Sequence, residues 1–240
     1  MRRTSAKRII FITGTDTGVG KTLLTGLLLR HLRQRGCHAL AMKPFCSGSR
    51  ADTRFLRAVQ GDELTLDEIT PFFFSEPLAP LVAARKQHRV IRSQEVVQRI
   101  RRLARRCECL LIEGIGGLLV PLGEGYTVRD LAAKLGCEVV LVSRNRLGTI
   151  NHTLLAGEAL QHAGIRRFTT VLMALPRGDP SAPHNWRILA ERLAPNPVFS
   201  IGFLGRDCRR FGALEKKEKK VQKTLARILA SSIVGALRSL

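Results

Sequence analysis

The stretch from Gly14 to Thr22, GTDTGVGKT, has the residue types of a phosphate-binding loop. Apolar residues 9–12 precede it and the mainly apolar segment 23–32 follows it, so a strand, a glycine-rich turn and a helix are expected in that order. Small residues let successive backbone N–H groups point at one anion, and the helix N-terminus adds partial positive charge. Lys21 would reach the outer phosphates and the Thr22 hydroxyl would ligate Mg²⁺. The sequence therefore predicts a nucleoside triphosphate site.

The loop departs from the common pattern of Gly, four residues, then Gly-Lys-Ser/Thr. Counting back from Gly20, the first glycine position holds Thr15, and the glycine stands one place earlier. This variant points away from ordinary motor-type NTPases. A chance Gly-Lys-Thr in a glycine-rich turn is the alternative, and it is disfavoured because strand, turn and helix all agree with phosphate binding.

Three further polar residues follow or end predicted strands. Lys43 ends the apolar run 39–43, Asp52 follows shortly after it, and Glu113 ends the run 109–113. Ligands bind at the carboxyl ends of strands in open parallel sheets, where a lysine can stabilise phosphoryl transfer. Lys-Pro is also common in surface turns, so Lys43 alone is ambiguous. Thr22, Asp52 and Glu113 together form the all-oxygen set that Mg²⁺ prefers.

Strand-length apolar runs alternate with amphipathic stretches, which predicts an α/β fold of the P-loop NTPase-like type: three layers, α/β/α, with a mainly parallel sheet. We expect one domain over residues 1–240. The predicted strands are 9–13, 39–43, 109–113, 139–143, 170–174 and 198–201. The predicted helices are 21–34, 52–59, 93–105, 128–135, 150–163, 184–193 and 214–237. Segment 70–80, TPFFFSEPLAP, is too rich in proline for a helix and is expected to be a surface loop whose phenylalanines pack inward.

The composition is strongly basic, with 40 Lys and Arg against 19 Asp and Glu and a net charge of +21. Such a charge attracts polyanions, but the basic residues are scattered and lack interleaved aromatic residues, so nucleic-acid binding is not expected. The six cysteines form no CxxC pair and no zinc spacing, and are expected to be reduced thiols. No signal peptide or membrane span is recognised, which predicts a soluble cytoplasmic protein.

Five stretches resemble the dethiobiotin synthetase family in order and separation. They are GTDTGVGKT, KPFCSGS followed by Asp52, EGIGGLLVPL, NRLGTINHTLL and the run 159–164, ALQHAG. The resemblance covers the first two thirds of the chain well and the remainder loosely. It implies an enzyme of biotin biosynthesis that converts 7,8-diaminononanoate and CO₂ to dethiobiotin with ATP and Mg²⁺. A carbamate forms on one amine, ATP phosphorylates it, and the second amine attacks the mixed anhydride.

The resemblance also assigns roles to individual residues. Lys21 and Lys43 would be catalytic. The nucleotide would contact Thr15, Asp16, Thr17, Gly18, Val19, Gly20, Lys21, Thr22, Glu113 and Gly116. The substrate would contact Thr17, Lys43, Ser47, Gly148, Thr149, Ile150 and Asn151. Gly116 and Gly117 have no side chains and would let the substrate lie close to the backbone. Thr22, Asp52 and Glu113 would hold Mg²⁺.

In this family the helix that begins near Gly148 receives the substrate carboxylate from the neighbouring subunit, which implies a homodimer. His152 and His162 are expected to be structural, because phosphoryl transfer here needs no histidine base. Trp186 either lines the substrate pocket or packs on the fold. Family members carry an asparagine for base recognition where this chain has Leu175, and the turn at 202–205 also differs. We therefore expect relaxed nucleotide choice.

Three rival functions remain. A carboxylate-amidating ligase would need an extra glutaminase region, for which the chain has no room. A partitioning-type ATPase would bind DNA and carry a second lysine where Thr15 stands. A copy without catalysis is disfavoured by the intact lysines and carboxylates.

Overall fold

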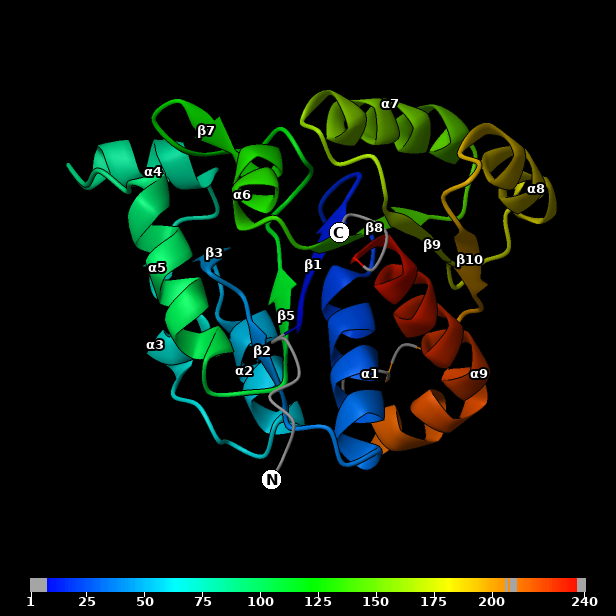
Figure 1. Cartoon of the computed structure of the whole chain (residues 1–240), viewed down its shortest axis with the longest axis horizontal. Coiled ribbons are helices and arrows are strands. Elements are labelled where there is room, and N and C mark those ends of the chain that lie inside the picture. Colours follow the sequence, from blue (N-terminus) through cyan, green and yellow to red (C-terminus); the bar gives the residue numbers. More distant parts are fainter. Residues whose placement is uncertain (1–7, 206, 208–210, 237–240) are drawn as a thin grey trace.

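The central sheet of the computed structural model, which describes residues 8–205, 207 and 211–236, consists of parallel strands in the order β10-β9-β8-β1-β5-β2 (Figure 1). These strands are β1 (Arg8–Gly14), β2 (Ala39–Met42), β5 (Cys109–Glu113), β8 (Glu138–Arg144), β9 (Thr169–Met173) and β10 (Val198–Ile201). β1 lies between β5 and β8, with Ile12 opposite both Glu113 and Val140. The carboxyl ends of β1 and β5 therefore meet at one edge of the sheet.

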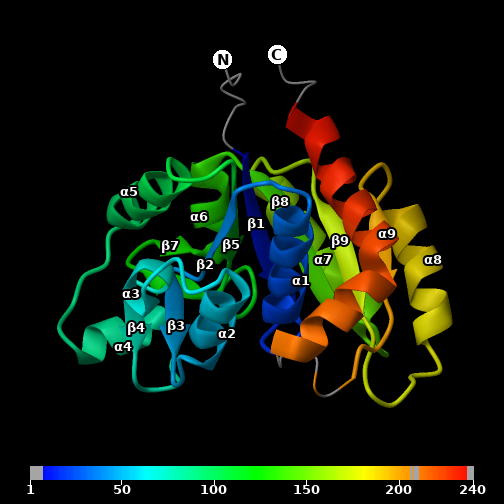
Figure 2. The same cartoon turned by 90° about the horizontal axis from the view of Figure 1, so that it is seen from below.

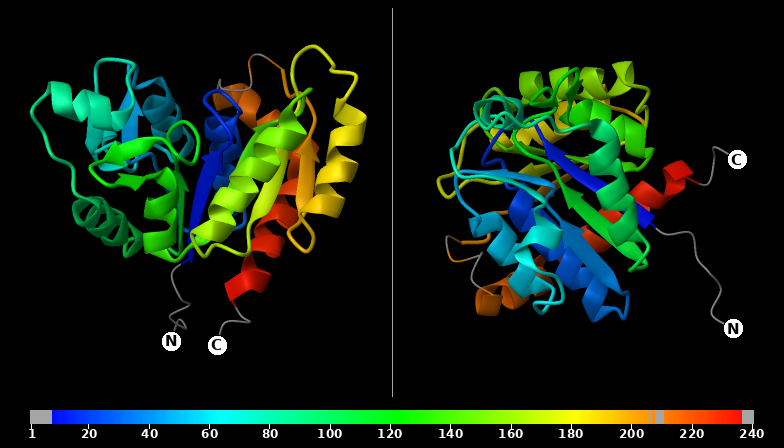
Figure 3. Two further views of the ribbon diagram at one scale, coloured as in Figure 1. Left: turned by 90° about the horizontal axis from the view of Figure 1, so that it is seen from above. Right: turned by 90° about the vertical axis from the view of Figure 1, so that its left-hand side faces the viewer.

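Helices cover both faces of the sheet, which explains why its strands are almost continuously apolar. α1 (Lys21–Gln34), α2 (Ala51–Val59) and α9 (Phe211–Ala236) lie on one face, where α9 packs on α1 and on β8, β9 and β10 (Figure 2). α5 (Ser93–Ala104), α6 (Val128–Leu135), α7 (Thr149–His162) and α8 (Ala182–Arg192) lie on the other (Figure 3). The predicted three-layer α/β/α fold with a parallel sheet is confirmed.

The prediction for segment 70–80 is wrong in part. Residues Phe72–Phe74 form a short strand, β4, which pairs in parallel with β3 (Phe45–Ser47). Phe72 and Phe74 are buried as expected. Two short helices, α3 (Leu66–Ile69) and α4 (Pro80–Lys86), and the antiparallel pair β6 (Pro121–Gly123) and β7 (Tyr126–Thr127) were not predicted. Three-residue strands carry too little periodicity to be seen in a sequence.

The other predicted helices and strands agree with the structure to within a few residues. α7 begins at Thr149 and α8 at Ala182, slightly earlier than predicted, and α9 begins at Phe211. The predicted end at Leu237 lies outside the described residues, as does Cys208. No helix in the described part of the chain is both long and apolar enough to cross a membrane.

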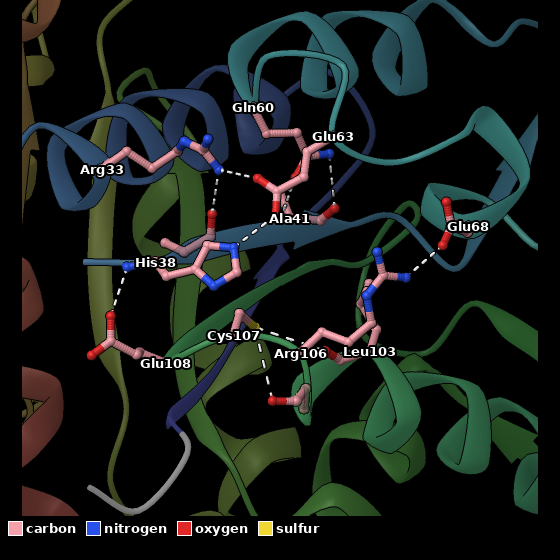
Figure 4. A network of polar contacts seen from close by, with 12 residues as sticks. Arg33, His38, Ala41, Gln60, Glu63, Glu68, Leu103, Arg106, Cys107 and Glu108 are labelled. Carbon is pink, nitrogen blue, oxygen red and sulfur yellow. Dashed lines mark hydrogen bonds and ion pairs between the residues drawn. The ribbon is translucent and has the colours of Figure 1, made fainter. Parts of the chain in front are cut away.

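A polar network closes the opposite end of the sheet, near the amino ends of β2 and β5 (Figure 4). Glu63 accepts hydrogen bonds from Arg33 at 3.0 Å and pairs with His38 at 2.7 Å. Burial alone would raise the pKa of Glu63, but these two partners lower it below its usual value. Gln60 is fully buried and accepts the N–H of Ala41 at 2.9 Å, which satisfies part of the edge strand β2. These contacts pair polar groups around the amino end of the edge strand β2.

Candidate functional site

The loop between β1 and α1, residues 14–22, is called the P-loop below. Gly18 has φ +70° and Gly20 has φ +109°, which are left-handed values that glycine adopts without strain. Gly20 is the N-cap residue of α1, and a Cβ on Gly14 would come within 2.7 Å of the side chain of Val19. The glycines therefore allow the chain to turn tightly enough for the N–H groups before α1 to surround an anion.

Lys21 is the first residue of α1, and its side chain folds back over the P-loop. Its Nζ donates to the carbonyl oxygens of Asp16 at 2.8 Å and Gly116 at 2.7 Å. Burial, followed by the charge of Lys43, lowers the pKa of Lys21 to about 8. The ammonium is thus held by neutral acceptors only, and a phosphate would be a stronger partner.

Glu113 is the hub of the site. Its Oε1 accepts from the hydroxyl of Thr22 at 2.7 Å and from Nζ of Lys43 at 2.5 Å. The same Nζ lies 3.1 Å from Oδ2 of Asp52. Side chains from α1, α2, the end of β5 and the residue after β2 therefore meet at the edge predicted from the sequence.

Lys43 is almost completely buried between these two carboxylates. Burial favours its neutral form, but the charges of Glu113 and Asp52 and the hydrogen bond to Glu113 outweigh burial and raise the pKa of Lys43 above its usual value. The ammonium is therefore a fixed positive charge at every pH at which proteins normally work.

The donor set around Lys43 fits a magnesium ion. Oε2 of Glu113 is buried and has no hydrogen-bond partner, so this carboxylate has an unused acceptor. Thr22, Asp52 and Glu113 supply only oxygen, the ligand atom that Mg²⁺ prefers. The described residues contain no group of three or more His, Cys, Asp or Glu side chains that could hold a metal, so phosphate oxygens and water would have to complete the coordination.

The glycines after Glu113 contact the P-loop. A Cβ on Gly117 would lie 3.1 Å from the carbonyl oxygen of Thr15, and one on Gly116 would lie 2.7 Å from the side chain of Val120. The sequence predicts that these glycines admit the substrate. In the structure Gly117 lies against the P-loop backbone, and the carbonyl of Gly116 accepts from Lys21.

The start of α7 adjoins the P-loop on its other side. A hollow there is lined by Thr15, Asp16, Val19, Ser143, Arg144, Arg146, Thr149 and His152. Thr149 is buried, and its hydroxyl contacts that of Ser143 at 2.7 Å, while Ser143 contacts Thr15 at 3.2 Å. The N–H of Thr149 already donates to Arg146. Ile150 and Asn151, the next two residues of the helix, therefore carry the N–H groups that can bind an anion.

Two residues of this hollow were missed by the sequence analysis. Ser143 and Arg144 end β8 without forming a motif, so only the fold reveals that they lie beside the P-loop. His152 also lines the hollow, whereas His162 pairs with the backbone carbonyl of Glu158 on the same helix.

The remaining predicted residues lie apart from the hub. Ser47 is half-buried at the end of β3, where its neighbour in register is Phe74. The indole of Trp186 donates to the carbonyl of Val198 at 2.8 Å, so this side chain packs on β10. Leu175 lies two residues after the end of β9. The last residue of that strand, Met173, lies beside the P-loop, because a Cβ on Gly20 would come within 3.0 Å of its side chain.

The parallel sheet, the glycine loop with Lys21 and Thr22, and the acidic end of β5 define a P-loop nucleotide-binding protein. Consistent with this class, the family described as AAA domain matches residues 8–224. A ParA family ATPase from Chlorobium tepidum TLS has a TM-score of 0.52 and 16% identity, covering 96% of this chain and 97% of that one. The pNOB8 ParA structure bound to nonspecific DNA has a TM-score of 0.59 and 12% identity, covering 98% of this chain and 100% of that one. At such identities these structures show the fold alone.

Curated sequences give the closer assignment. An ATP-dependent dethiobiotin synthetase from Anaeromyxobacter sp. (strain Fw109-5) is 45% identical over 80% of this chain and 88% of the relative. Another, from Bacillus subtilis (strain 168), is 40% identical over 81% of this chain and 86% of the relative. The chain therefore belongs to the ATP-dependent dethiobiotin synthetase family. The resemblance identified from the sequence is confirmed, and the partitioning ATPase and amidating ligase are not favoured.

Proposed function

We propose that this protein closes the ureido ring of dethiobiotin, with ATP as co-substrate, at the cluster formed by Lys21, Lys43 and Glu113. The observation that carries the proposal is the position of Lys43. Its ammonium is fixed next to the P-loop lysine and between two carboxylates, where a phosphoryl group would pass between nucleotide and substrate. The site therefore provides positioned charge, which is what phosphoryl transfer requires.

The reaction has three steps. One amine of the diamine adds to CO₂ and loses a proton, which gives a carbamate. An oxygen of the carbamate attacks the γ-phosphorus of ATP, the bond to the β-phosphate oxygen breaks, and ADP leaves. The second amine then attacks the carbonyl carbon of the mixed anhydride, and its proton leaves with the phosphate. Phosphorylation is needed because a carbamate oxygen is otherwise a poor leaving group.

The two lysines act differently in these steps. Lys21 exchanges its contacts with Asp16 and Gly116 for the γ-phosphate. Lys43 binds the carbamate oxygen and then the transferred phosphoryl group, and its raised pKa keeps it charged, so it is not a general base. Backbone N–H groups of the P-loop hold the other phosphates.

Thr22, Asp52 and Glu113 would hold Mg²⁺, and the unused Oε2 of Glu113 supports this assignment. When bound, the ion would supply positive charge to the phosphate oxygens. Lys43 contacts Asp52 and Oε1 of Glu113, so Oε2 of Glu113 would remain available to the ion.

For the diamine we propose contacts to Thr17, Ser47 and Lys43 near its amines, and to the α7 N-terminus at its carboxylate. Gly148 begins that helix in a left-handed conformation, and no acidic residue lies in its first turn to compete with an anion. The carboxylate would come from a diamine bound in the partner subunit of a homodimer.

The experiment that tests this function is direct. Purified protein is incubated with diaminononanoate, bicarbonate, Mg²⁺ and ATP, and dethiobiotin is measured by mass spectrometry. A Lys43→Met variant should lose at least about 100-fold in kcat, whereas Lys86→Met, at an exposed lysine of α4, should not change it. Absence of product together with an ATPase activity stimulated by DNA would contradict the proposal.

We also propose that the enzyme accepts other nucleoside triphosphates, because Leu175 offers no hydrogen bond to the base. Initial rates with ATP, CTP and GTP at equal concentration should then lie within about tenfold of one another. A strong preference for ATP would rule this out.

A further inference from the structure

Arg144, the last residue of β8, lies directly on the P-loop. Its Nε donates to the carbonyl oxygen of Gly18 at 3.2 Å, and its Nη2 donates to that of Thr17 at 3.3 Å. A Cβ on Gly18 would come within 2.5 Å of the same Nη2. The guanidinium therefore packs against the one P-loop residue whose lack of a side chain makes room for it.

These two contacts fix the direction of the neighbouring N–H groups. The peptide bonds are trans, since the cis bond found among the described residues is Ala194–Pro195. In a trans peptide the carbonyl and the following N–H point in opposite directions. Holding the carbonyls of Thr17 and Gly18 on one side of the loop therefore turns the N–H groups of Gly18 and Val19 to the other side.

We propose that Arg144 is a positioning residue for the triphosphate. It orders the N–H groups of Gly18 and Val19 before the nucleotide arrives, an inference that rests on the proposed use of the P-loop for ATP. Preorganised donors bind an anion more tightly because less conformational freedom is lost on binding. Gly18 is exposed and left-handed, so without Arg144 its peptide planes would be free to rotate.

An arginine suits this role better than a lysine. Its planar fork places two N–H donors on two carbonyl oxygens at once, whereas an ammonium is a point charge on a flexible stem. Lys21 holds the preceding carbonyl, that of Asp16, but must release it to reach the γ-phosphate. Arg144 does not have to release its two carbonyl oxygens when ATP binds. Residues 17 and 18 of the loop therefore stay ordered while Lys21 moves.

The test compares Arg144→Met and Arg144→Lys with Arg187→Met, a matched control at an exposed arginine of α8. The Kd for ATP is measured by calorimetry, and KM and kcat from dethiobiotin formation. Arg144→Met should raise both Kd and KM for ATP about tenfold, as expected for the loss of charge-assisted hydrogen bonds. Its kcat at saturating ATP should change by a smaller factor than its KM for ATP, because Arg144 contacts the backbone of the loop and no reacting atom. Arg144→Lys should recover only part of the affinity.

Several results would overturn the inference. If Arg144→Met matched Arg187→Met, the contacts would be irrelevant to binding. If Arg144→Lys restored full affinity, and the Arg144→Met effect vanished in high salt, long-range charge would be the cause. A fall in kcat at unchanged KM would make Arg144 a catalytic residue instead. Wild-type protein that bound no ATP would overturn the proposed function together with this inference, and equal thermal unfolding midpoints without nucleotide would exclude misfolding of the variants.

Discussion

Lys21 and Lys43 lie beside the same carboxylate, yet their surroundings shift their pKa values in opposite directions. Lys21 contacts only backbone carbonyls, so burial and the charge of Lys43 dominate and lower its pKa to about 8. Lys43 is paired with two carboxylates, so its pKa is raised. The free site therefore keeps Lys43 charged, whereas Lys21 loses its proton as the pH rises above about 8.

The affinity for ATP should fall as the pH rises through 8. Below its pKa of about 8, Lys21 is already charged in the free protein. Above that pH it is mostly neutral, and binding must then include proton uptake, because the phosphate favours the ammonium. Between pH 7 and pH 9 the Kd should rise about tenfold. Titration with a fluorescent ATP analogue at constant ionic strength measures this change.

A Lys21→Arg variant is the control, because its guanidinium stays charged over this range. The pH dependence of its Kd should be nearly flat. Calorimetry of the wild-type protein at pH 8 in two buffers of different ionisation enthalpy should show uptake of about half a proton. A wild-type Kd that does not change between pH 7 and 9 would show that Lys21 is already charged at pH 9.

At the scale of the elements, a parallel sheet makes the hub predictable. Glu113 and Lys43 each follow an apolar run, and the carboxyl ends of such strands meet at one edge, so their convergence follows from the sequence. Arg144 was not predictable, because its partners are backbone carbonyls 126 and 127 residues away. The β3–β4 pair was missed because its strands are short and depend on tertiary packing.

The docking of α9 depends on polar residues that helical periodicity conceals. His31 of α1 and Glu218 of α9 are both buried, with 1% and 0% of their side chains exposed, and His31 Nδ1 lies 2.7 Å from Glu218 Oε1. The helical periodicity of apolar residues predicts that both side chains are exposed, because only hydrophobic positions count toward the buried face. Inside the interface this contact pairs two buried polar groups, and Arg35 also lies 3.0 Å from His31 Nδ1.

Glu218→Ala should therefore lower the free energy of unfolding by about 3 kcal/mol, because it leaves the imidazole of His31 buried without its carboxylate partner. Glu215→Ala is the matched control on the same helix. Its side chain is 47% exposed and pairs with Arg30 and Lys219, so its loss should cost less than about 1 kcal/mol. Urea denaturation followed by circular dichroism measures both values. Equal losses for the two variants would mean that the buried pair adds no stability.

At the scale of the whole molecule, the sheet places two binding regions on either side of β1. Lys43 follows β2 and Glu113 ends β5, whereas the N-terminus of α7 follows β8. In the proposed homodimer each active site combines the hub of one subunit with the α7 N-terminus of its partner. The diamine suits such a shared site, because its amines and its carboxylate lie at opposite ends of an aliphatic chain.

A shared site predicts that two inactive variants restore each other. Lys43→Met removes the charge at the hub, and Asn151→Asp places a carboxylate where the substrate carboxylate should bind, so each homodimer should be inactive. In a mixed dimer one site receives both defects and the other receives neither. Random mixing by unfolding and refolding should therefore restore about a quarter of wild-type activity. If each site belonged to one subunit, the mixture would stay inactive, even though sedimentation showed a dimer.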